Sequence, residues 1–109
     1  MAAEIVEVIV TANDVEWLAG FARSLVEDRI AACGNVAYPV RSIYRWKGTI
    51  EDQQEARVTI HTRAALVPTI IDRANHEHPY EVPCVIALPI VAANPDYAAW
   101  VIEQTDEPS

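Results

Sequence analysis

The sequence is poor in cysteine and glycine. It has two cysteines, Cys33 and Cys84, without a Cys-x-x-Cys spacing, and three glycines among 109 residues. Two isolated cysteines indicate neither a disulfide framework nor a zinc knuckle, so we expect reduced, partly buried thiols. No polar or Pro/Gly-rich linker divides the chain, which favours a single domain over residues 1–109.

Basic residues are also scarce, with eight Lys and Arg against sixteen Asp and Glu and a formal net charge of −8. This charge repels phosphate backbones and anionic lipids, so we expect neither nucleic acid nor a membrane as a partner. An acidic surface attracts cations, but net charge also simply keeps proteins soluble. No apolar run reaches the ~20 residues of a membrane span, and no secretion signal is recognised, so a cytoplasmic location is expected.

Apolar residues recur with the periods of strands and helices in turn along the chain. Asn13, with Glu16 three residues later, predicts the start of a helix, and Asn94-Pro95 predicts the start of a short last one. Residues 4–11 read as a strand buried on both faces, and Lys47-Gly48 as a turn. Strands are expected at 4–11, 31–46, 54–62 and 84–91, and helices at 14–29, at 64–75 (with His76 and His78 just past its end) and after residue 94.

This order of elements predicts an α+β fold, a ferredoxin-like βαββαβ sandwich with a short C-terminal helix. Right-handed crossovers place the two main helices on one face of an antiparallel sheet. The second and fourth strands then lie at opposite edges, which argues against a disulfide between Cys33 and Cys84 within one subunit. The other sheet face has no helix in this prediction, and another subunit is its simplest cover.

Several blocks of sequence together resemble the CutA family of divalent-cation tolerance proteins. They are RIAAC at residues 29–33, SIYRWKG at 42–48, HPYEVP at 78–83, Leu88-Pro89 and Tyr97-x-x-Trp100. The resemblance implies a homotrimer, similar in architecture to PII-type signalling proteins. It also implies a role in tolerance of copper and other divalent cations, and no known catalysed reaction.

The resemblance also directs attention to possible metal ligands. Copper contacts proposed for bacterial relatives include a cysteine before the Thr that ends the first strand and a His-His pair before Pro-Tyr. This chain has Val10 at the first position and Glu77-His78 at the second. The alternative is that His78 fixes its loop by hydrogen bonds. The candidate ligands for copper or another divalent ion are therefore His78, Glu77, His76 and Cys84.

Two departures from the family pattern define a further hypothesis. Cys84 stands where relatives usually carry a glutamate, and His61 where they usually carry a lysine. If those two groups normally interact, His61 and Cys84 form a new pair here; otherwise they changed independently. Cys33, beside two alanines, is either a small buried hydrophobe or a ligand.

Aromatic residues form the remaining candidate site. They line either a ligand cleft at a subunit boundary or a packed interface. The full set of ligand or interface candidates is Cys33, Tyr44, Trp46, His61, Tyr80, Glu81, Tyr97 and Trp100.

Three functions compete on this sequence. The leading one is a homotrimeric divalent-cation tolerance protein that binds copper or another divalent ion. The second is a PII-like signalling protein that binds a small metabolite between subunits. A thiol enzyme using His61, Cys84 and Glu81 comes last, because GxSxG, HExxH and P-loop motifs are missing, and we expect no enzyme.

Overall fold

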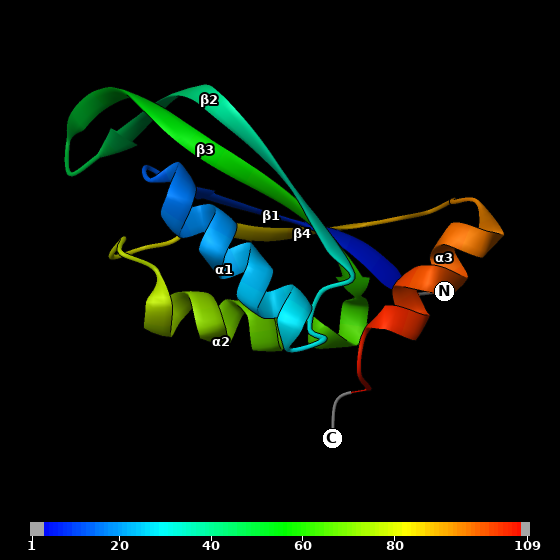
Figure 1. Cartoon of the computed structure of the whole chain (residues 1–109). Helices are drawn as coiled ribbons and strands as arrows, with labels where there is room; N and C mark the ends of the chain where they lie inside the picture. The colour runs from blue at the N-terminus through cyan, green and yellow to red at the C-terminus, as the bar shows by residue number, and fades with distance from the viewer. Residues whose placement is uncertain (1–3, 108–109) are drawn as a thin grey trace.

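The computed structural model describes residues 4–107 and follows the predicted order of elements (Figure 1). Each predicted strand and helix is present, with shifted ends. A one-turn 3-10 helix, η1 (Ala64–Leu66), leads into the second helix. The elements are β1 (Ile5–Ala12), α1 (Val15–Glu27), β2 (Cys33–Trp46), β3 (Thr49–Arg63), α2 (Val67–Glu77), β4 (Val85–Pro89) and α3 (Pro95–Gln104).

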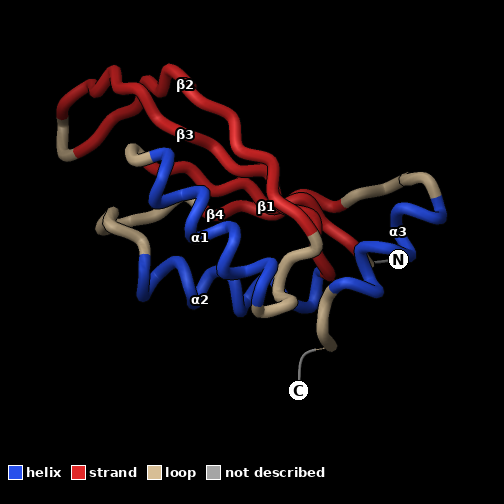
Figure 2. Tube along the Cα trace, in the orientation of Figure 1, coloured by secondary structure: helices blue, strands red, loops and turns tan. Residues whose placement is uncertain are grey.

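The four strands form one antiparallel sheet in the order β2-β3-β1-β4 (Figure 2). In the centre of the sheet Val8 lies opposite Ile60 of β3 and Ala87 of β4. This order confirms that β2 and β4 occupy opposite edges.

Helices α1 and α2 lie side by side on one face of the sheet (Figure 1). Their Leu18, Leu25 and Ile70 are fully buried, as are Val8 and Ile60 of the strands beneath them. Each such side chain contributes about 1.5–3 kcal/mol by leaving water. The burial of this face is the main source of the fold's stability.

The second sheet face corrects two expectations. Strand β1 is fully buried on one side only, because Glu7 and Ile9 on the other side are only partly covered. That second face is not free of helices either, since α3 covers one end of it and packs Val101 against Ile5 and Ala32. Among residues 4–107, no other helix covers the rest of the second face.

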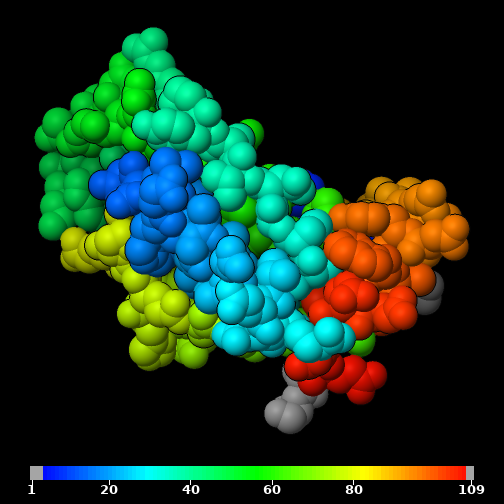
Figure 3. Space-filling view, in the orientation of Figure 1, coloured from blue at the N-terminus to red at the C-terminus, as the bar shows by residue number. Residues whose placement is uncertain are grey.

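Strands β2 and β3 form a long hairpin that projects beyond the helices (Figure 3). Lys47 and Gly48 at its tip both have positive φ, +48° and +82°, as a two-residue hairpin turn of type I′ requires. A register shift in β2 follows Ala37, where the Tyr38–Pro39 peptide bond is cis. Strand β3 begins five residues earlier than expected, because pairing with β2 rather than burial sustains its first half.

Several helix ends also differ from the prediction. Asp14, not Asn13, caps α1, because its carboxylate accepts the amide hydrogens of Glu16 and Trp17 at 2.9 and 3.1 Å. Helix α2 continues to Glu77, so His76 lies inside it. No helix within residues 4–107 is long and apolar enough to cross a membrane.

Candidate functional site

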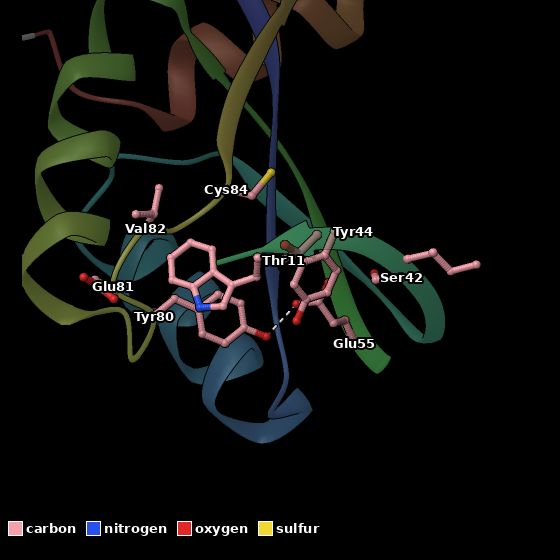
Figure 4. A pocket seen from close by; sticks show the side chains of 10 residues that line it. Thr11, Ser42, Tyr44, Glu55, Tyr80, Glu81, Val82 and Cys84 are labelled. Atoms are coloured by element: carbon pink, nitrogen blue, oxygen red, sulfur yellow. Dashed lines mark hydrogen bonds between the residues drawn. The ribbon is translucent and has the colours of Figure 1, made fainter. Parts of the chain in front are cut away.

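A cavity of about 610 Å³ opens at the base of the β2–β3 hairpin (Figure 4). The hairpin, the end of β1 and the loop between α2 and β4 form its walls. Its lining combines aromatic rings with two carboxylates and a thiol. The lining residues are Thr11, Ser42, Ile43, Tyr44, Trp46, Glu55, Tyr80, Glu81, Val82 and Cys84.

The most buried polar group of this cavity is the carboxylate of Glu55. Its side chain comes from β3, and the residue is only 6% exposed. The Tyr80 hydroxyl donates a hydrogen bond of 2.5 Å to Glu55 Oε2. Burial, and then the neighbouring Glu55, raise the pKa of Tyr80, so the hydroxyl keeps its proton and remains a donor. Sequence reasoning missed Glu55, because neither spacing nor a motif marks it.

His78 lies behind this cavity and fixes the loop that carries Tyr80. Its Nε2 is 2.7 Å from the Thr11 carbonyl oxygen, which can only accept, so Nε2 donates. Its Nδ1 accepts the backbone amide hydrogen of Tyr80 at 3.0 Å. The ring is buried and packs edge-on against Trp17. Both nitrogens are therefore occupied by backbone groups, and neither presents a lone pair to an ion.

The other predicted metal ligands do not gather around His78. His76 is exposed on α2, and its Nδ1 donates to the Asp72 carbonyl oxygen at 2.8 Å, which raises the pKa of His76. Glu77 forms an ion pair with Arg73. Within residues 4–107, no three His, Cys, Asp or Glu side chains are grouped to hold a metal ion. The described part of one chain therefore does not by itself group three such ligands into a site for a divalent cation.

Cys84 and Glu81 are the accessible donors at the cavity. The Cys84 thiol is free and exposed just before β4. The Glu81 carboxylate pairs with Lys47 at 3.4 Å, and this ammonium group also lies 5.5 Å from the centroid of the Trp46 ring. The Lys47 ammonium group thus already occupies the space between the Trp46 ring and the Glu81 carboxylate at the mouth of the cavity.

His61 does not lie beside Cys84. The strand register places His61 opposite Glu7, whereas Cys84 precedes Val85, which lies opposite Val10. Within one chain, the two changes from the family pattern are therefore not a contacting pair. His61 contacts Glu7, Cys33 and Tyr97 instead.

The five aromatic residues predicted to line a ligand cleft or a packed interface at a subunit boundary lie in two places within one chain. Tyr44, Trp46 and Tyr80 line the cavity, whereas Tyr97 and Trp100 lie on α3, where their ring centroids are 5.6 Å apart. These five aromatic residues therefore do not line a single cleft within one chain.

Comparisons with known sequences agree with this architecture. The family model for CutA1 divalent ion tolerance protein matches residues 6–104. The chain is 46% identical over 88 residues to Protein CutA of Mus musculus, covering 81% of this chain and 50% of that protein. It is 38% identical over 98 residues to the divalent-cation tolerance protein CutA of Thermus thermophilus, covering 90% and 95%. The chain thus spans about half the length of its mammalian relatives and nearly all of the bacterial one.

Solved structures give the same result. The divalent cation tolerance protein of Thermus thermophilus superposes with a TM-score of 0.90 at 36% identity, covering 94% of this chain and 99% of that one. CutA1 of Oryza sativa superposes with a TM-score of 0.93 at 32% identity, covering 98% of each chain. Sequence and structure together place this chain in the CutA1 divalent ion tolerance protein family.

Proposed function

We propose that the chain acts as a cytoplasmic homotrimer that binds divalent cations, copper foremost, in the response to metals. It is a binding protein in this proposal and not an enzyme. The observation that carries the proposal is that accessible donors line an open cavity, while residues 4–107 of one chain do not group three of them into an ion site. A second subunit would supply both the missing donors and the missing cover.

Exposed apolar side chains support the oligomer. Ile86 and Leu88 of β4 point from the second sheet face and are 51% and 43% exposed, and Ile43 and Ile50 of the hairpin are 64% and 57% exposed. The radius of gyration is 14.4 Å, against about 13 Å for a compact chain of this length. A projecting hairpin with apolar sides gains stability when a neighbouring copy covers it.

The accessible donors support cation binding at a subunit boundary. Cys84 presents a soft thiol, and Glu81 presents a carboxylate that is paired with Lys47. An ion held there would displace the Lys47 ammonium and complete its coordination with donors of a second copy. His78 would act through the loop it fixes and not as a ligand.

The test is metal titration of chelator-treated, reduced protein followed by native mass spectrometry with Cu(II), Zn(II) and Ni(II). Stoichiometric uptake by a trimer, weakened in Cys84→Ser and retained in the matched control Cys33→Ser, is expected. A trimer that takes up no ion would remove the metal-binding part of the proposal. A monomer under all conditions would remove both parts.

The cavity favours a second function, a PII-like sensor of a small metabolite. A volume of about 610 Å³ is typical of small-molecule sites, and aromatic walls around the Glu55–Tyr80 pair would bind and orient a ligand. A metabolite that raises the melting temperature of metal-free trimer by mass action would favour this function. Tyr80→Phe and Glu55→Gln would then reduce the shift.

A further inference from the structure

A second cluster of reactive side chains lies at the other end of the sheet. Strand pairing aligns Glu7 of β1, His61 of β3 and Cys33 of β2 in one row across the second face. Tyr97 of α3 reaches the same row. Glu7 precedes Thr11, the cavity residue on β1, by four residues, about 13 Å at strand spacing. The two clusters are therefore separate.

The hydrogen bonds of His61 define which ring nitrogen carries a lone pair. Nε2 lies 3.0 Å from Glu7 Oε1, and an ionised carboxylate can only accept, so Nε2 donates. The Tyr97 hydroxyl lies 2.5 Å from Nδ1. With the ring proton on Nε2, Nδ1 can only accept, and a phenolic hydroxyl carries its proton at neutral pH, so the Tyr97 hydroxyl donates. The lone pair of Nδ1 therefore faces Tyr97 and Cys33.

The two donor atoms are close enough to bind one ion. Cys33 Sγ lies 3.7 Å from His61 Nδ1. A thiolate sulfur and an imidazole nitrogen that bind one ion at about 2.3 and 2.1 Å lie at most about 4.4 Å apart, when they face each other across the ion. A two-coordinate ion therefore requires the two atoms to separate by less than about 1 Å.

Glu7 supplies the outer contact that ligating histidines normally have. A carboxylate that accepts from the far ring nitrogen fixes the tautomer and the ring orientation and increases ligand basicity. The Glu7–His61 hydrogen bond is arranged in this way. The imidazole is thus oriented before any ion arrives.

We propose that Cys33 and His61 form a binding site for a soft ion of low coordination number, with Cu(I) as its occupant. Thiolate sulfur selects Cu(I), whereas two protein donors do not satisfy the four-coordinate preference of a structural Zn(II) site. Binding forms a Cu–S and a Cu–N bond and releases the Cys33 thiol proton to the buffer. It also breaks the Tyr97–His61 hydrogen bond, because the hydroxyl must leave Nδ1.

This site is distinct from the one in the proposed function. It uses the other thiol, the other end of the sheet and a different oxidation state of copper. Neither Cys33 nor His61 lines the cavity of the proposed function.

The test is a competition titration of the full-length, reduced protein with Cu(I) against a chromophoric Cu(I) chelator without oxygen. We expect Cys33→Ser and His61→Ala to lower Cu(I) affinity by at least about 100-fold. Glu7→Gln should lower it by about 10- to 100-fold, as outer-contact substitutions do. Tyr97→Phe should raise affinity by about three- to tenfold, because the ion no longer competes with a hydrogen bond.

Cys84→Ser is the matched control, since it removes the other thiol, and should leave Cu(I) affinity unchanged. Cu(I) retained by Cys33→Ser would overturn the site. The site would also be overturned if Cys33→Ser lost Cu(I) affinity while His61→Ala and Glu7→Gln both kept it, because that result would mean adventitious binding to a thiol.

X-ray absorption of the wild-type Cu(I) complex gives a check that needs no variant. One sulfur and one nitrogen ligand are expected, and sulfur ligands alone would contradict the proposal. If uptake of divalent ions is lost only in Cys84→Ser, the proposed function stands whether or not the Cu(I) site is confirmed.

Discussion

The two ends of the sheet each hold a histidine, and the two histidines differ in what holds them. His78, behind the cavity, has both ring nitrogens bound to backbone groups of Thr11 and Tyr80. His61, at the other end, is held by the side chains of Glu7 and Tyr97. Backbone partners are fixed by the fold, whereas a side chain such as Tyr97 can rotate away. A histidine's capacity to bind an ion therefore depends on its partners as much as on its exposure.

The largest difference between the two ends should appear in stability. His78→Ala removes two hydrogen bonds and leaves a cavity, so we expect a loss of about 2–4 kcal/mol in the free energy of unfolding. His61→Ala should cost about 1 kcal/mol, and the exposed His76→Ala almost nothing. Urea unfolding at constant protein concentration measures all three. An equal cost for His78 and His61 would remove the distinction between the two sites.

The Glu55–Tyr80 pair should give the next largest effect. Tyr80→Phe leaves a buried carboxylate without its donor, so a loss of about 1.5–3 kcal/mol is expected. Glu81→Gln, on the same cavity but exposed, is the control and should cost less than about 0.5 kcal/mol. A double-mutant cycle with Glu55→Gln should show strong coupling. Additive losses would mean that the two side chains do not act as a pair.

Tyr97, at the far end of the sheet, should make a smaller contribution to stability, which is lost at high pH. The pKa of Tyr97 is about 12 in the folded chain, above the value of about 10 for an unfolded one. The folded form therefore holds the proton more tightly, and this stabilisation is complete below pH about 10 and is lost as the pH rises towards 12. The ultraviolet titration difference between wild type and Tyr97→Phe should show one tyrosine ionising near pH 12. Ionisation near pH 10 would contradict a hydroxyl held by His61 and Cys33.

The hairpin arm should be the least sensitive region. Arg41 and Asp52 form a bidentate pair on it, which lowers the pKa of Asp52, but both are exposed to solvent. Solvent and salt screen such pairs, so Asp52→Asn should leave the melting temperature of the protein unchanged within error. A clear loss of trimer in this variant would instead place the pair in a subunit contact.

The sequence predicted the order of elements and the strand order well, because both follow from apolar periodicity and a strong handedness rule. It located the Asn94 cap of α3, but placed the first cap one residue early, at Asn13, since neighbouring Asn and Asp residues offer the same chemistry. The early start of β3 was missed because the first half of this strand has no apolar alternation. This half pairs with β2 in the exposed, projecting part of the hairpin.

The candidate sites were harder to predict, because contacts across a sheet depend on register. His61 and Cys84 were paired because both depart from the family pattern, but register places Glu7 and Cys33 beside His61. Glu7 lies on the same strand side as Ile9 and Thr11, and pairing the first and third strands residue by residue would have identified it. Both ring nitrogens of His78 are hydrogen-bonded to backbone groups because of the conformation of its loop. A single sequence does not define that conformation.

The most direct test of this account compares two single-thiol variants with two oxidation states of copper. Native mass spectrometry of Cys84→Ser and Cys33→Ser, each titrated with Cu(II) and, under reducing conditions, with Cu(I), separates the two ends of the sheet. We expect Cys84→Ser to lose Cu(II) and keep Cu(I), and Cys33→Ser to do the reverse. The account of two separate sites would be contradicted if one variant lost both ions, or if neither variant lost either ion.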